Sequence, residues 1–440
     1  MVREANPGQT AERDGKLDSS MMTNRRKFLA STAAGAGITA LAGCTGGGGG
    51  NTIKIGAPYM LSGVAESFGA SSREGAELAA KEINDEGGID GQDVEIIFRD
   101  HGGSDAARVI RSLVQEDNVD AMIGLTSSGV AVASAPLIEQ LQIPMILTDI
   151  GTAFVTEPDT DTYGEDAVGN DYVFRTNANT AQNMYGMVQN VAENMDGIET
   201  VACMGPDYAY GHQVWDYFQA MSESYDGLDL EYLDASFTSL GSTDMSAQIS
   251  SILDLEPDLL VTGYWADDVT TFVQQALDQG IEDTVDNVIT ALASDVLQFE
   301  SLGETMPDGW HWHGWYWHEA FDTEANNSFV ESYEEEYGNP PAMQPPSSYE
   351  AIYAYKQVIE SVGTNSDDIV GELEGMTYDG VRGEVTIDAD SHQANAPAVG
   401  GVSTYSEDLG RATLEPVQTY EPDAEEIRSL LEGSELPPGV

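Results

Sequence analysis

The stretch IKIGAPYMLSGVAESFGASSREGAELAAKEINDEGGIDGQDVEIIF, residues 53–98, decides the fold of this chain. Its two apolar ends predict strands at 53–57 and 94–98. Between them, Ser71 and Glu74 form an S-x-x-E capping box, which predicts the start of an amphipathic helix. A strand, a helix and a second strand in this order form the repeating unit of a parallel sheet with crossover helices. The stretch therefore predicts an α/β protein.

The same alternation continues along the chain in two series, which an acidic stretch at 156–172 separates. Short apolar runs predict further strands, and longer amphipathic runs between them predict helices. The further strands are expected at 121–124, 145–147, 200–204, 259–262, 288–290, 310–317, 384–387 and 399–405. Two similar series predict two lobes, each built on a mainly parallel sheet.

The charge of the chain is strongly negative. Its 440 residues include 17 Lys and Arg against 76 Asp and Glu, which gives a formal net charge of −59. A nucleic-acid partner is excluded, because such binding needs a basic surface. Self-repulsion at this charge destabilises a compact state in dilute buffer, whereas molar salt screens charges beyond about 3 Å. The composition therefore predicts a protein of a halophilic host.

The first fifty residues predict export and a lipid anchor. Arg25 and Arg26 precede an uncharged stretch that runs to Gly43, an arrangement typical of a twin-arginine signal. The stretch ends in Leu-Ala-Gly-Cys, which resembles a lipoprotein signal box with Cys44 as the lipidated mature N-terminus. We expect a signal peptide at 1–43, a lipidated Gly-rich tether at 44–51, and anchoring to the outer face of the cytoplasmic membrane. Chemistry that needs cytoplasmic ATP or NAD is disfavoured at that location.

An ordered series of motifs carries a resemblance to a known family. The motifs include Ile53-Lys54-Ile55-Gly56, Leu61-Ser62-Gly63, Gly87-Gly88-Ile89-Asp90-Gly91, Ile143-Pro144-Met145-Ile146, Val173-Phe174-Arg175 and Tyr208-Ala209-Tyr210-Gly211. With these motifs in this order, the chain resembles the solute-binding proteins of branched-chain amino acid ABC transporters. The likeness is close over roughly residues 52–300 and looser over 300–410.

The resemblance implies a periplasmic-binding-protein fold of type I. In this α/β fold, two lobes with helices on both faces of each sheet are joined by three crossings, and they close over a solute held in the cleft. The implied lobe 1 covers 52–174 and about 316–378, and the implied lobe 2 covers about 175–315 and 379–430. The implied partners are a small polar solute, such as an amino acid or amide, and ABC permease subunits in the membrane. No cofactor is implied.

Ligands of open α/β sheets bind beyond the carboxyl ends of the strands, so site residues are expected there. Ser127 and Ser128 follow the strand at 121–124 and open a helix, where backbone N–H groups and the helix dipole favour an anion such as a carboxylate. The alternative is that either serine only caps the helix. Ser127 also resembles the family serine that holds the amino-acid carboxylate.

The remaining candidates follow from the resemblance. Thr152 resembles the threonine that contacts both ends of the ligand, with Ile150 near the family's backbone-donor position. Phe68 and Tyr210 match aromatic cleft positions, one from each lobe, and either Tyr264 or Trp265 matches a further aromatic. The family's ammonium-binding acid is expected after the strand at 288–290, where the segment is uncharged and only Asp295 is near. The solute is therefore an amino acid, or an amide or acid without an ammonium group.

Two further patterns, a histidine pair and a glycosylation sequon, lie in the later part of the chain. His311 and His313 share one face of the expected aromatic strand and could bind a metal, but an aromatic strand at an interlobe crossing is the favoured interpretation, so no metal site is predicted. Asn326-Asn327-Ser328 is a glycosylation sequon, which indicates an exposed loop and nothing more. No hydrolase elbow, zinc-protease or Walker sequence is present, so no enzyme is predicted. A sensory receptor subunit with the same clamp is the alternative function, and a secreted hydrolase is a third.

Overall fold

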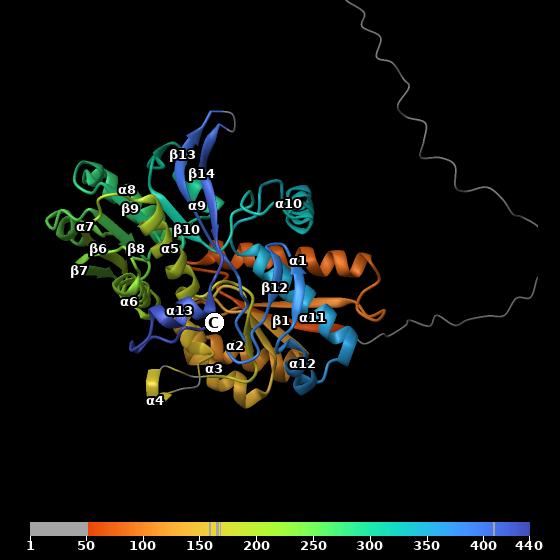
Figure 1. Cartoon of the computed structure of the whole chain (residues 1–440). Coiled ribbons are helices and arrows are strands. Elements are labelled where there is room, and N and C mark those ends of the chain that lie inside the picture. Colours follow the sequence, from red (N-terminus) through yellow and green to blue (C-terminus); the bar gives the residue numbers. More distant parts are fainter. Residues whose placement is uncertain (1–51, 158–159, 164–166, 168, 408–409) are drawn as a thin grey trace, which may run out of the picture. The chain divides into compact units, whose positions relative to one another are not determined.

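The structure is a computed structural model that describes residues 52–157, 160–163, 167, 169–407 and 410–440. These residues form two main sheets with their helices and a short hairpin, in the order shown in Figure 1. The expected signal sequence and Cys44 lie outside the described residues. Within the described part of the chain, no helix is long and apolar enough to cross a membrane.

The first sheet has five strands, all parallel, in the order β2-β1-β3-β4-β5. The strands are β1 (Ile53–Tyr59), β2 (Val94–Asp100), β3 (Ala121–Gly124), β4 (Met145–Leu147) and β5 (Val173–Arg175). β3, β4 and β5 are buried at every position, as expected for a parallel sheet covered on both faces. We call this sheet and its helices lobe 1.

The helices of lobe 1 come from two separate parts of the chain. The first part supplies α1 (Glu66–Asp85), α2 (Ala106–Ser112) with η1 (Leu113–Asp117), α3 (Ser128–Leu141), η2 (Ala153–Val155) and α4 (Thr160–Tyr163). The second part supplies α10 (Glu324–Tyr337), α11 (Pro345–Val362), α12 (Ser366–Leu373) and the hairpin β11 (Thr377–Gly380) and β12 (Gly383–Thr386). α1 and α11 pack closely, because a Cβ at Gly75 would lie only 2.2 Å from the carbonyl oxygen of Pro345.

The second sheet has seven strands in the order β14-β13-β10-β9-β8-β6-β7, and we call it and its helices lobe 2. The strands are β6 (Thr200–Pro206), β7 (Glu231–Thr238), β8 (Leu259–Thr262), β9 (Asn287–Thr290), β10 (His311–Gly314), β13 (Ala398–Ser406) and β14 (Arg411–Tyr420). The helices are α5 (Thr180–Asn194), α6 (Ala209–Ser224), α7 (Ser246–Leu253), α8 (Asp267–Asp278), η3 (Ile281–Asp283), α9 (Val296–Leu302), η4 (Gly303–Thr305) and α13 (Ala424–Leu430). Five strands are parallel, and the hairpin of β13 and β14 extends the sheet in antiparallel fashion.

Three segments cross between the lobes, and two of them are tied together. They are 176–179, 315–323 and 387–397. Beside the first crossing, the backbone of Arg175 pairs with that of His392 and Ala394, both at 3.0 Å. The Gln393 amide donates to the Asn177 carbonyl oxygen at 2.8 Å and accepts from the Arg175 guanidinium at 2.7 Å. The first and third crossings therefore form one hydrogen-bonded hinge.

The two-lobed α/β fold is confirmed, but some expected details are wrong. The capping box does not start a helix, since α1 begins at Glu66 and Ser71 lies within it. The Ser71 hydroxyl instead donates to Gln344 of α11 at 2.9 Å, so a tertiary contact takes the group that would have capped. The strand expected at 310–317 pairs only over His311–Gly314, because the chain then leaves the sheet for the second crossing. The ranges expected for the two lobes stay predictions.

Tyrosine hydroxyls bind carboxylates where α10 and α11 pack on α1. Tyr333 donates to Glu74, and Tyr349 and Tyr353 both donate to Glu82, at 2.5 and 3.0 Å. The chain has only five lysines, and here a neutral phenol fills the place that an ammonium group often takes. These tyrosine–glutamate contacts join segments that are more than 250 residues apart in the chain.

Candidate functional site: the cleft between the two sheets

One pocket lies where the carboxyl ends of strands from both sheets meet. Lobe 1 contributes the segments after β3 and β4, and lobe 2 contributes those after β6, β8, β9 and β10. The pocket is lined by Ser127, Ser128, Asp149, Gly151, Tyr208, Tyr210, Trp265, Leu292 and Trp315. Its free volume is about 10 Å³, which is room for roughly one water molecule. A solute enters only if the lobes or their aromatic side chains move apart.

Ser127 forms part of the lobe 1 wall in an unusual backbone conformation. It lies directly before α3 with φ 82° and ψ 123°, a region in which a residue with a side chain stores about 1–3 kcal/mol of strain. Its side chain makes no capping hydrogen bond to α3. The Ser128 side chain does not cap the helix either, since its hydroxyl oxygen accepts a hydrogen bond from the Thr152 backbone N–H at 3.2 Å. Helix capping therefore does not account for either serine.

Asp149 brings a carboxyl group to the same wall. It follows β4 and is 5% exposed. The Thr126 hydroxyl hydrogen-bonds to this carboxyl, but among the residues that the structure describes Oδ2 has no hydrogen-bond partner. Burial raises the pKa of Asp149 well above its usual value, and the nearby charge of Asp295 raises it further. An unpaired carboxyl oxygen in a closed cleft is costly unless a ligand satisfies it.

The lobe 2 wall is aromatic. Trp265 follows β8, and its ring centroid lies 5.5 Å from that of Phe68 on α1, so this contact joins the two lobes. Tyr208 and Tyr210 follow β6, with ring centroids 6.3 Å apart. Within the described residues, the Trp265 Nε1 and the Tyr210 hydroxyl have no hydrogen-bond partner. Buried tryptophan and tyrosine normally find such a partner, so these two polar atoms also point to a ligand.

Four of the residues expected from the sequence line the pocket: Ser127, Ser128, Tyr210 and Trp265. Phe68 is fully buried and packs behind Trp265 without lining the pocket. The structure therefore brings expected residues that follow three different strands, β3, β6 and β8, to one place. Whether they bind a solute stays a prediction.

Three other expected residues lie outside the pocket lining. The Tyr264 ring points into lobe 2, where its hydroxyl pairs with that of Thr238 at 3.1 Å. The backbone of Ile150 pairs in both directions with the Asn177 side chain, at 3.4 and 2.9 Å. Thr152 is fully buried and caps η2 with its side chain. These three residues support the walls of the pocket without lining it.

Asp295 also lies outside the lining, and its carboxylate is already in use. It caps α9 by accepting from the Leu297 backbone N–H at 2.9 Å, and its other oxygen accepts from the Gln344 amide at 3.0 Å. Burial raises the pKa of Asp295 to about 6. With both oxygens paired, this acid holds α9 against α11 and has little capacity left for a solute.

Sequence reasoning missed five of the lining residues. They are Asp149, Gly151, Tyr208, Leu292 and Trp315. The rule that sites follow strand ends could have found Asp149, which comes two residues after β4. Gly151 has a steric role, because a Cβ there would lie 3.1 Å from the Tyr210 ring and 2.9 Å from the Thr180 hydroxyl. The absence of a side chain lets the tyrosine close on lobe 1.

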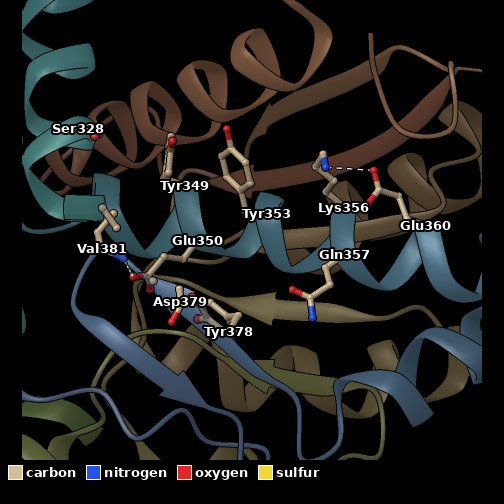
Figure 2. A pocket seen from close by; sticks show the side chains of 12 residues that line it. Ser328, Tyr349, Glu350, Tyr353, Lys356, Gln357, Glu360, Tyr378, Asp379 and Val381 are labelled. Carbon is tan, nitrogen blue, oxygen red and sulfur yellow. Dashed lines mark hydrogen bonds and ion pairs between the residues drawn. The ribbon is translucent and has the colours of Figure 1, made fainter. Parts of the chain in front are cut away.

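A larger pocket, of about 500 Å³, lies on lobe 1 between α10, α11 and β11, away from the strand ends. Figure 2 shows Lys356 reaching Glu360 along α11, an ion pair of 3.0 Å. In the same view Glu350 accepts from the Val381 backbone N–H at 2.9 Å. Outside the lining, Arg382 forms a buried ion pair with Glu350. Lys356, Glu360 and Glu350 are therefore already paired, and the size of this pocket alone does not make it the solute site.

The histidine pair and the sequon have structural explanations. The Asn190 side chain lies 3.2 Å from His311 and 2.6 Å from His313, and the described residues contain no cluster of three metal-ligating side chains. Asn326 is fully buried in α10, where its side chain accepts from the Tyr316 hydroxyl at 2.8 Å. The sequon therefore does not mark an exposed loop, and its asparagine has no room for a glycan.

Two α/β lobes that close on a pocket at the ends of their strands define a binding protein that captures a small solute between its lobes. The periplasmic binding protein family model matches residues 52–401, and the chain belongs to this family. It is a solute-binding protein of the ABC-transporter type and not an enzyme.

Known relatives and solved structures agree with this assignment. Leu/Ile/Val-binding protein homolog 6 of Brucella suis is 24% identical over 356 residues, which cover 78% of this chain and 85% of the relative. A branched-chain amino acid transporter substrate-binding protein from Streptococcus pneumoniae, solved with isoleucine, has a TM-score of 0.71 at 21% identity, covering 84% of this chain and all of that one. A solute-binding protein from Rhodopseudomonas palustris, solved with 3,4-dihydroxybenzoic acid, has a TM-score of 0.73 at 21% identity over 84% of this chain and 98% of that one.

Proposed function

We propose that this chain is the exported, lipid-anchored binding component of an ABC importer, which delivers a small polar solute, an amino acid or an amide, to permease subunits in the membrane. The observation that carries the proposal is the cleft pocket. Three buried polar atoms without a partner in the described structure, on Asp149, Tyr210 and Trp265, line one closed space between the lobes. Such a set needs a polar ligand of matching chemistry.

The proposed anchor rests on the sequence. Cys44 follows Leu-Ala-Gly at the end of an uncharged stretch, after Arg25 and Arg26. A diacylglyceryl group on this thiol has two acyl chains, enough for stable membrane attachment. The acidic composition supports action in concentrated salt, where self-repulsion is screened.

The proposed binding mode uses one chemistry from each lobe. The start of α3 with Ser127 and Ser128 receives a negatively polarised group of the solute, as helix N-termini do. The aromatic wall of lobe 2, with Tyr208, Tyr210 and Trp265, covers the apolar part. Closing of this wall on lobe 1 couples binding to a change in lobe separation.

A thermal-shift panel of amino acids, amides, urea and small carboxylates, measured on the full chain in molar salt, tests the proposal. A solute that binds only the folded protein, at 100 times its dissociation constant, adds about 2.7 kcal/mol to the free energy of unfolding. We expect at least one panel member to raise the melting temperature. A panel that produces no shift at saturating concentrations contradicts the proposed solute class.

A further inference from the structure

We propose that Asp149 accepts an N–H group of the solute, so that the cleft selects small molecules with an ammonium or amide nitrogen over simple carboxylic acids. This inference rests on the proposed function and narrows it. The question is open because the structural neighbours include a protein solved with isoleucine and one solved with a dihydroxybenzoic acid. The two ligands differ in whether they carry an N–H donor.

The lining of the cleft is acidic and not basic. Of the nine lining residues, Asp149 is the only one with a carboxyl group, and none is Lys, Arg or His. A carboxylic acid without nitrogen therefore meets one buried carboxyl and no cation to balance its own charge. Burial already disfavours the ionised form of Asp149. A second carboxylate beside it disfavours that form further, whereas an ammonium group stabilises it. The N-terminus of α3 contributes only a partial positive charge toward balancing the carboxylate of such a solute.

The polar atoms that lack a partner also indicate which hydrogen-bonding groups the solute carries. The Asp149 Oδ2 accepts hydrogen bonds when ionised, whereas the Trp265 Nε1 can only donate. The Tyr210 hydroxyl, which is also unpartnered in the described structure, can do either. A solute that satisfies all three carries both a donor, for Asp149, and an acceptor, for Trp265. An amide has both groups, and so does an amino acid zwitterion.

The aromatic wall favours the same class of solute. Tyr208, Tyr210, Trp265 and Trp315 bring four electron-rich rings to the pocket, and the faces of such rings attract ammonium groups. The acid that the sequence pointed to, Asp295, already has both oxygens paired with Leu297 and Gln344. Asp149 is the buried acid with a free oxygen at the cleft, and it comes from lobe 1 instead of lobe 2.

The test uses pairs of probes that differ in the nitrogen: leucine with isocaproate, acetamide with acetate, and benzamide with benzoate. Calorimetry and thermal shift on the full chain, in molar salt, give an affinity for each. We expect the nitrogen-bearing member of at least one pair to bind about tenfold to a hundredfold more tightly than its partner, which is the range for a hydrogen bond to a charged group. Asp149→Asn should weaken the binding of that probe by a similar factor and should not weaken the binding of its carboxylate partner, because the asparagine amide adds an N–H donor and carries no negative charge.

Asp268→Asn is the matched control, because it removes another buried carboxyl outside the cleft. Asp268 lies at the start of α8 and accepts from the Gly241 backbone N–H at 3.0 Å, so this variant should bind every probe as the wild type does. The inference is overturned if, in every pair that binds, the carboxylate binds the wild type as tightly as its nitrogen-bearing partner, or if Asp149→Asn leaves the affinity for the nitrogen-bearing probe unchanged. In either case the proposed function stands. If no probe of any pair binds the wild type, the proposed function itself fails.

Discussion

Replacing Ser127 by glycine and, separately, by alanine distinguishes the backbone strain at this residue from the contribution of its hydroxyl to solute binding. Ser127 has φ 82° and makes no capping hydrogen bond, so helix capping does not offset the strain of its backbone conformation. Glycine adopts this region without a steric penalty. Ser127→Gly therefore removes both the strain and the hydroxyl, whereas Ser127→Ala removes only the hydroxyl.

The expected magnitudes follow from the structure. Relief of about 1–3 kcal/mol of strain should stabilise the unliganded Ser127→Gly protein. For a folded unit that runs from Gly50 to Val440, an unfolding entropy of about 2.1 cal/mol/K per residue makes each kcal/mol worth about 1 °C in melting temperature. We expect a rise of about 1–4 °C for Ser127→Gly and almost no change for Ser127→Ala. Both variants should bind the best solute about tenfold to a hundredfold more weakly.

Differential scanning calorimetry without solute and titration calorimetry with it provide the two measurements in molar salt. A drop in melting temperature of about 1 °C for Ser127→Ala would show that the hydroxyl caps α3 after all. Unchanged affinity in both variants would refute a role for Ser127 in binding. A Ser127→Gly protein that is less stable than the wild type would refute the strain argument.

Three further predictions concern other parts of the molecule. Trp265→Ala should weaken solute binding much more than Trp265→Phe in titration calorimetry, because the large ring closes the cleft; equal losses would count against this. The pKa of Asp295 is raised by burial from 3.8 to about 6, so the protonated form is favoured in the fold and stability falls as the pH rises through about 6. In thermal unfolding measured as a function of pH, Asp295→Asn should reduce the decrease in melting temperature. An unchanged decrease would contradict the assignment to Asp295. Glu350→Gln should cost about 3–5 kcal/mol in denaturant unfolding, because it leaves the buried Arg382 charge without its partner; a loss below about 1 kcal/mol would show that the pair is dispensable.

Much of the fold could be predicted because a parallel sheet leaves a strong pattern in the sequence. The strands expected at 121–124, 145–147 and 259–262 are found at those residues, since buried strands between turns are continuous apolar runs. β7 and β14 were missed for the opposite reason. Each has exposed and half-buried positions, so neither forms an apolar run. The helix start at Ser71 failed because a local motif cannot reveal that α11, far along the chain, takes the hydroxyl.

The site could be predicted in part, from the rule that ligands bind beyond the ends of strands. That rule located Ser127 and Ser128, and the family resemblance added Tyr264 and Trp265 as alternatives. The structure separates them, since only Trp265 lines the cleft and Tyr264 points into lobe 2. Asp149 was passed over because the resemblance pointed to Ile150 and Thr152 in the same segment. Only the three-dimensional structure shows that its oxygen lacks a partner.

The tyrosine–glutamate contacts between α1 and its neighbours affect how the protein responds to ionic strength. A phenol is uncharged at neutral pH, and burial raises the pKa of Tyr333 and Tyr349 further above their usual value. A hydrogen bond from a neutral donor does not depend on attraction between opposite charges, so dissolved ions weaken it less than they weaken an exposed lysine–carboxylate pair. The attachment of these helices to one another should therefore change less with ionic strength than attachment through exposed ion pairs. The excess of acidic groups over basic ones also opposes aggregation of one copy with another.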